Sequence, residues 1–136
     1  KLYLASHELF HIMYQELVCN KYKKRRVVWF DEGMAQFFSG EYDYELSDKY
    51  FENWFKTLVK DTKIIPNLND LDHGSEFETS NYSGYKLSLL AVKYLYDTMT
   101  FDSFKELMYN PDDIIENGSK VLTDAFKYYN NKYNKS

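Results

Sequence analysis

The chain has 136 residues, enough for one domain with a single hydrophobic core. Apolar residues make up 44% and aromatic residues 19% of the sequence, which predicts a folded globule and excludes a disordered chain. The net charge of −4 argues against nucleic acid as a partner, and no apolar run approaches the roughly 20 residues that span a bilayer.

Residues 1–19 are predicted to form a helix, because apolar side chains recur along one face at spacings of three and four. This face carries Ala5, Leu9, Ile12, Met13 and Leu17. An adjacent stripe of the same helix carries Leu4, His7, His11, Tyr14 and Val18. Residues 20–26 are basic and lack an apolar period, so they are predicted to be a solvated loop.

Further helices are predicted downstream, and they make the fold all-α. Their ranges are 28–39, ended by Gly40; 48–60, with Ser47 as the N-cap; 81–99; 101–109; and 119–132, with Ser119 at its start. Residues 61–79 are rich in turn formers and are predicted to be irregular, and the polar tail from Asn130 is expected to fray. The organisation expected is one domain over 1–136, with a helical C-terminal part over 47–132.

The run His7-Glu8-Leu9-Phe10-His11 carries the first chemical signal. Positions four apart lie on one face of a helix, so both imidazoles can reach the same point. A zinc ion takes nitrogen ligands at about 2.0–2.1 Å, which such a pair supplies without distortion. Glu8 lies on the flank of that face, where its carboxylate can hold a metal-bound water. The run therefore predicts a zinc site.

A catalytic zinc takes three protein ligands and keeps one position open, so a third ligand is needed from a later element. Glu32 meets this need at the start of the second predicted helix. Gly33 beside it is small enough to let the helix approach the metal closely, as is Ala35, and the apolar pair Trp29-Phe30 helps to exclude water. Cys19 is a poor fourth ligand, because it lies about two turns beyond His11 on the same helix.

These motifs together resemble the gluzincin zinc metallopeptidases of the peptidase MA clan. The resemblance rests on His7-Glu8-x-x-His11 followed by Trp29-x-x-Glu32-Gly33-x-Ala35, and residues 29–40 look most like the corresponding helix of bacterial collagenases. It implies that His7, His11 and Glu32 bind Zn²⁺ and that Glu8 is the general base. The interval between the motifs differs from that of the aminopeptidases and collagenases, so the subfamily stays open.

The resemblance also implies a tyrosine that stabilises the oxyanion at the start of a long helix. Tyr85, in Tyr85-Lys86-Leu87-Ser88, matches that position, and Tyr82 is the competing candidate. Two further residues have alternative interpretations. His73 is either a polar donor near the metal or a surface residue. Asp31 either orients one of the two histidines or only complements the helix N-terminus.

The resemblance implies peptide or protein substrates, and a β-sheet subdomain upstream that completes the cleft and is missing from this chain. Because the chain starts at Lys1, inside the motif helix, we expect it to be an excerpt of a longer protein. Exopeptidase and endopeptidase activity both stay open, and the resemblance favours a secreted or cell-surface setting. The rival hypotheses are a non-catalytic helical module, for binding or scaffolding, and a structural zinc site. Structural sites favour cysteine-rich sets of four ligands, and this chain has one cysteine.

Overall fold

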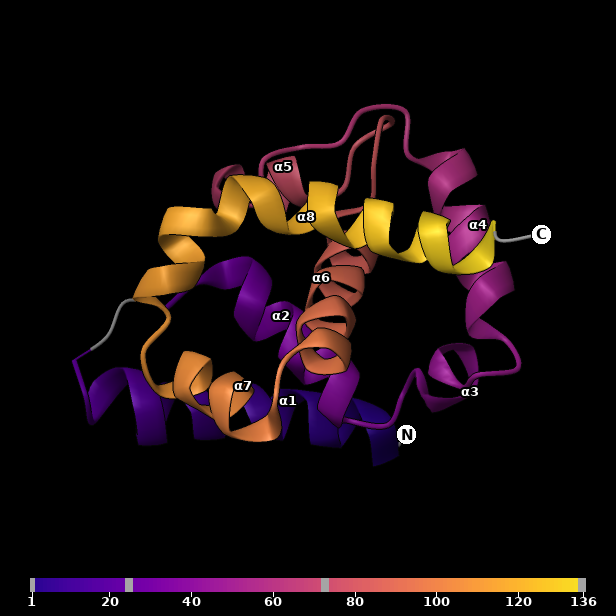
Figure 1. Ribbon diagram of the computed structural model, residues 1–136. Coiled ribbons are helices and arrows are strands. Elements are labelled where there is room, and N and C mark those ends of the chain that lie inside the picture. The colour runs from indigo at the N-terminus through magenta and orange to yellow at the C-terminus, as the bar shows by residue number, and fades with distance from the viewer. Residues whose placement is uncertain (1, 24–25, 72–73, 135–136) are drawn as a thin grey trace.

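The computed structural model describes residues 2–23, 26–71 and 74–134, and these form an all-α fold (Figure 1). No strand occurs among these residues, and only an isolated bridge joins Glu78 to Ser83. The helices are α1 (Leu2–Tyr14), the π-helix η1 (Gln15–Asn20), α2 (Val28–Phe38), α3 (Asp43–Leu46), α4 (Phe51–Asp61), the 3-10 helix η2 (Leu68–Asp70), α5 (Gly74–Phe77), α6 (Gly84–Thr98), α7 (Phe101–Tyr109) and α8 (Asp112–Tyr133).

Helices α2 and α6 form the centre of the molecule (Figure 1). Helix α1 packs on α2, and α8 packs on α6 from the opposite side and also contacts α4. The buried apolar side chains make one continuous cluster, and in α2 the predicted pair Trp29 and Phe30 is fully buried in it. The central position of α2 gives Glu32 a rigid support, because its helix is held from both sides.

Several aromatic residues pack together where α4 meets α8. Tyr129 of α8 is fully buried against Phe51 and Phe55 of α4. Its hydroxyl donates a hydrogen bond of 2.7 Å to the carboxylate of Asp97 in α6. This bond satisfies a polar group that would otherwise be costly to bury.

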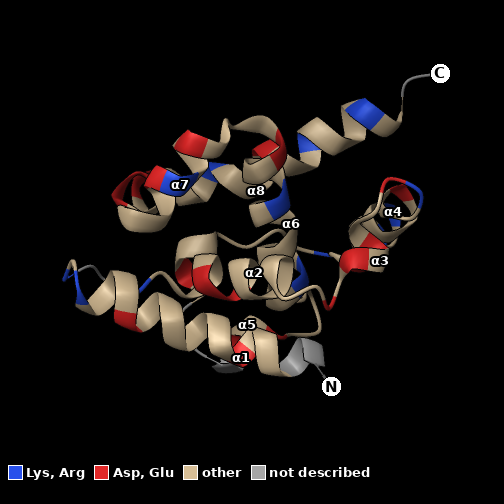
Figure 2. Ribbon diagram, turned by 90° about the horizontal axis from the view of Figure 1, so that it is seen from below, with Lys and Arg blue, Asp and Glu red and all other residues tan. Residues whose placement is uncertain are grey.

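Helix α1 faces the core with the stripe that carries the histidines, and not with its most apolar face. Tyr14 and Val18 are buried, whereas Leu9, Ile12 and Leu17 are each more than half exposed. Figure 2 shows α1 as a surface helix with long stretches free of charged residues. The orientation of α1 is thus decided by its packing on α2, and the apolar face is left uncovered by the described residues.

The predicted start of α8 was wrong, whereas its predicted end at residue 132 agrees with the structure to one residue. The helix starts at Asp112, seven residues before the predicted start, and Ser119 lies inside it. Two aspartates in the first turn complement the helix N-terminus, and Ile114 in that turn is buried. The tail does not fray at Asn130, because Tyr133 packs against Phe51 and Phe55.

Other boundaries also differ from the prediction. Helix α4 begins at Phe51, and Ser47 does not cap it but donates its hydroxyl hydrogen to the Tyr44 carbonyl. Helix α6 begins at Gly84, where the Ser83 hydroxyl accepts from a backbone N–H and forms the N-cap. The first predicted helix, 1–19, is α-helical over Leu2–Tyr14 and continues as the π-helix η1 over Gln15–Asn20. The structure adds α3, and it adds η2 and α5 within the stretch expected to be irregular.

Within the part of the chain that the structure describes, no helix combines the length and the apolar character needed to cross a membrane.

Candidate metal centre

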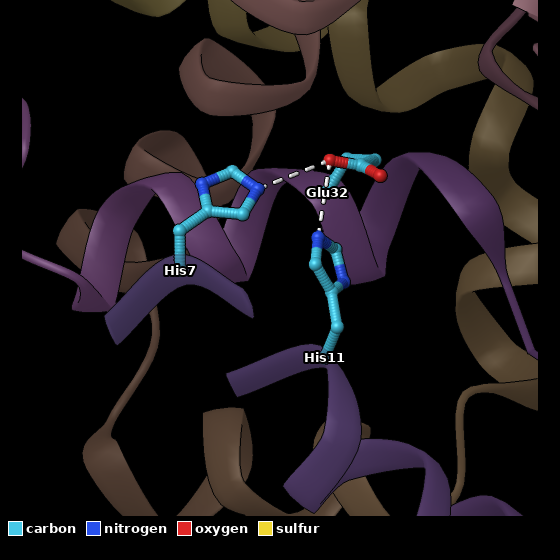
Figure 3. A group of neighbouring side chains, drawn as sticks. All are labelled: His7, His11 and Glu32. Atoms are coloured by element: carbon cyan, nitrogen blue, oxygen red, sulfur yellow. Dashed lines mark ion pairs between the residues drawn. The ribbon is translucent and has the colours of Figure 1, made fainter. Parts of the chain in front are cut away.

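Helices α1 and α2 bring three potential metal ligands together. His7 and His11 point from α1 toward Glu32 of α2 (Figure 3). The Nε2 atoms of the two histidines lie 3.5 and 3.4 Å from the same carboxylate oxygen, Oε2 of Glu32. One ligand atom from each of the three residues lies within 4.8 Å of the others. The structure thus brings together the three residues that were predicted as ligands.

The spacing of these atoms suits a zinc ion better than direct hydrogen bonds. Charge-assisted N–H···O bonds are about 2.7–2.9 Å long, and both observed distances exceed this range. Two ligand atoms at about 2.0–2.1 Å from a tetrahedral ion lie about 3.3–3.4 Å apart. The donor set of two imidazoles and one carboxylate is also the set that catalytic zinc uses. The residues present therefore fit a zinc ion.

A carboxylate lies beside Nδ1 of each histidine ring. Nδ1 of His7 is hydrogen-bonded to Oε1 of Glu41. Nδ1 of His11 lies 3.0 Å from Oδ1 of Asp31, an ion-pair contact that is out of line for a hydrogen bond. Each Nδ1 thus has a carboxylate partner while each Nε2 faces Glu32, the arrangement that is usual for zinc-binding histidines. Of the two interpretations of Asp31, this contact favours orientation of a histidine, namely His11.

Arg26 completes the charge pattern around Glu32. Its Nε donates a 2.5 Å hydrogen bond to Oδ2 of Asp31, whose side chain is only 2% exposed, and its Nη2 lies 3.6 Å from Oε1 of Glu32. The carboxylates of Asp31 and Glu32 raise the pKa of His11 to about 10. Burial alone would raise the pKa of Glu32, but His11, together with the charges of His7 and Arg26, holds it below its ordinary value.

The charged side chains of the described site carry more negative than positive charge when the two imidazoles are neutral. The carboxylates of Asp31, Glu32 and Glu41 carry three negative charges, and Arg26 carries one positive charge. The remaining formal charge of minus two matches a divalent cation. Without a cation, protonation of His11 compensates part of this charge, in agreement with its raised pKa.

Glu8 follows His7 on the flank of the ligand face of α1, and its side chain is exposed. Tyr85 opens α6 and is 43% exposed, with its ring against that of Phe77. The competing candidate, Tyr82, donates its hydroxyl hydrogen to the backbone carbonyl of Glu76 at 2.6 Å. No such bond is found for the Tyr85 hydroxyl among the described residues. His73 lies outside them.

Gln36 links the ligand helix to the start of α6. Its side-chain amide is almost fully buried and donates to the backbone carbonyl of Glu32 at 3.3 Å and to that of Tyr85 at 2.8 Å. The first turn of α6 is therefore tied to the turn of α2 that carries the carboxylate ligand. This places the backbone of Tyr85 next to α2, while its phenol ring stays accessible.

Gly33 was predicted to let its helix approach the metal closely, and this prediction was wrong. A Cβ atom at Gly33 would lie 2.4 Å from the carbonyl oxygen of Ser88, so the glycine allows close packing against α6 and not against the metal. Cys19 is buried in η1 and is not part of the ligand group, as expected.

The sequence did not predict a role for Glu41, Arg26 or Gln36. Glu41 lies 34 residues from His7, and only the turn after α2 brings the two together. Arg26 belongs to the basic run 20–26, which the sequence predicts to be a solvated loop. Its spacing of five residues from Asp31 was the one local signal that it could pair with the ligand helix.

Comparisons of the chain with protein-family models, curated proteins and solved structures found no match.

Proposed function

We propose that this chain carries the metal centre of a zinc-dependent peptidase. The observation that supports this most directly is that His7 Nε2 and His11 Nε2 both lie at a zinc-like spacing from Glu32 Oε2, within one group of three potential ligands. The resemblance to gluzincins gives the same three ligands. A structural zinc site is disfavoured, because Cys19 lies outside the group and the described group provides three ligands where such sites have four.

A zinc ion bound here supplies Lewis-acid chemistry, which activates water and polarises the carbonyl of a peptide bond. Glu8, next to His7 on the motif helix, is accessible to accept the proton of the attacking water and to pass it to the leaving amine. Tyr85 is the proposed donor to the oxyanion. Its hydroxyl has no hydrogen bond among the described residues, whereas that of Tyr82 is bonded to Glu76.

The substrates proposed are peptides or proteins. In this proposal the helices described above are the helical part of a zincin-like catalytic domain. An upstream part of the polypeptide, carrying a β-sheet, would complete the cleft in which the substrate backbone lies. The uncovered apolar face of α1 and η1, with Leu9, Ile12 and Leu17, agrees with a further element packing there.

The test is hydrolysis of a quenched fluorescent peptide library by the purified protein, together with its zinc content by elemental analysis. We expect about one zinc per chain, hydrolysis that a chelator abolishes, and recovery when zinc is restored. A protein that binds no zinc would overturn the proposal. Zinc binding without hydrolysis of any peptide would instead support the alternative, a non-catalytic zinc-binding or scaffolding domain.

A further inference from the structure

The turn after α2 brings a carboxylate to the back of the metal site. Glu41 is half-buried, and its Oε1 atom is hydrogen-bonded to Nδ1 of His7. When the ring is neutral, a proton held on Nδ1 by this bond leaves the lone pair on Nε2. That atom is the one that faces Glu32 at 3.5 Å. Glu41 thus selects the tautomer and the ring direction that metal binding needs.

The backbone of this turn is built to return Glu41 toward α1. Helix α2 ends at Phe38, and Gly40 has φ 88, a conformation that favours glycine. The Ser39 hydroxyl accepts a 3.3 Å hydrogen bond from the Glu41 N–H, and the Asp43 N–H donates to the Gly40 carbonyl at 3.2 Å. The position of the carboxylate is therefore set by a closed turn and not by the side chain alone.

The two histidines are supported in different ways. Asp31, behind His11, is buried in α2 beside the ligand Glu32 and is fixed by Arg26. Glu41, behind His7, lies outside the core in a turn between helices. Removal of Asp31 would disturb the core, whereas Glu41 can be removed without opening a buried cavity. The Glu41 contact can therefore be tested separately from folding.

We propose that Glu41 is a positioning residue of the metal centre, which holds His7 in the tautomer and direction required for zinc binding. This inference rests on the proposed function, but the contact between Glu41 and His7 can be tested independently of it. Loss of a carboxylate behind a zinc-binding histidine typically weakens metal affinity by about 10–100-fold.

The first measurement is zinc affinity, by competition with a chromophoric chelator, for the wild type, Glu41→Ala and Glu41→Gln. We expect Glu41→Ala to bind zinc about 10–100-fold more weakly. Glu41→Gln keeps an accepting oxygen but loses the charge, so its affinity should be intermediate. The matched control is Glu45→Gln in α3, which removes a negative charge from the same region. Glu41 and Glu45 occupy the same region, since the charges of both raise the pKa of Tyr42. Burial of Tyr42 raises that pKa more than either charge does.

The second measurement is the ¹⁵N NMR spectrum of the histidine rings in the metal-free protein. We expect the ring nitrogens of His7 to shift in Glu41→Ala and to stay unchanged in Glu45→Gln. If the wild type binds no zinc, the proposed function fails, and the His7 signals alone decide whether Glu41 holds the ring. Unchanged His7 signals in Glu41→Ala would overturn the inference, as would an unchanged zinc affinity in a zinc-binding protein.

A backbone variant tests the turn with the carboxylate retained. Gly40→Ala places a side chain at φ 88, in the left-handed region that disfavours residues with a Cβ atom, and so favours a different path for the turn. We expect weaker zinc binding in Gly40→Ala and recovery in Gly40→Asn, since asparagine tolerates this region. Equal zinc affinity in the wild type and Gly40→Ala would show that the turn does not position Glu41.

Discussion

The backbone of Gly33 in α2 lies directly against the backbone carbonyl of Ser88 in α6. A Cβ atom at Gly33 would come within 2.4 Å of that oxygen and within 2.5 Å of Cγ2 of Val92. Neither neighbour is a flexible chain end, since one is backbone and the other is a buried β-branched side chain. The distance between the two central helices is therefore set at the residue next to the proposed ligand Glu32.

We expect Gly33→Ala to lower the free energy of unfolding by about 1–3 kcal/mol, because an added methyl group in a close-packed core forces the helices apart. The same shift moves Glu32 away from the histidines, so zinc affinity should fall as well. Urea unfolding and zinc titration measure the two effects. The matched control is Lys120→Ala in α8, an exposed change that should leave both quantities unchanged. Equal stability of Gly33→Ala and the wild type would contradict the close packing.

Glu8→Gln separates metal binding from catalysis. The residue lies beside the ligands but is not one of the converging group, so we expect the variant to keep its zinc. Without a general base, peptide hydrolysis should fall by about 10²–10⁴-fold. Elemental analysis and the peptide assay check these outcomes on the same sample. Glu16→Gln, an exposed change on η1, is the control and should keep its activity. Full activity of Glu8→Gln would remove Glu8 from the mechanism.

Tyr85→Phe and Tyr82→Phe distinguish the two candidates for the oxyanion donor. Each substitution removes one hydroxyl group and keeps the ring. We expect Tyr85→Phe to lower kcat by about 10²–10³-fold, the usual effect of losing one oxyanion donor. Tyr82→Phe loses only its bond to the Glu76 carbonyl, so it should affect stability more than kcat. If Tyr82→Phe lowered kcat more than Tyr85→Phe, Tyr82 would be the oxyanion donor.

Tyr129→Phe tests the buried hydroxyl between α8 and α6. The variant loses a hydrogen bond to the Asp97 carboxylate, which is worth about 1.5–3 kcal/mol at neutral pH. Burial, with the Asp97 charge, raises the pKa of Tyr129 above its ordinary value. The unfolded chain therefore ionises first, and the stabilisation is lost as pH rises above about 10.

Urea unfolding at pH 7 and above pH 10 measures both effects. The wild type should lose stability with rising pH more steeply than Tyr129→Phe. The control is Tyr96→Phe, which removes a hydroxyl from a more exposed ring. If the stability of Tyr129→Phe fell as steeply as that of the wild type, ionisation of Tyr129 would not be the cause.

Local patterns predicted several elements well. The ranges of α2 and α7 agree with the structure almost to the residue, because apolar spacing and, for α2, the glycine that follows its end are short-range signals. The start of α8 was missed because Asn117, Gly118 and Ser119 are poor helix formers. Contacts of Gly118 with Asn69, distant in the sequence, override that weak preference.

The pattern His7-Glu8-x-x-His11 determined by itself that two imidazoles share a helix face, since a spacing of four residues fixes direction on any α-helix. The sequence also contained the carboxylate at Glu32. Only the tertiary structure decided that this carboxylate meets the imidazoles and that Glu41 lies behind His7. It also decided that the less apolar face of α1 turns inward. Such contacts join residues 20 or more positions apart, and their geometry depends on how whole helices pack, which no local period encodes.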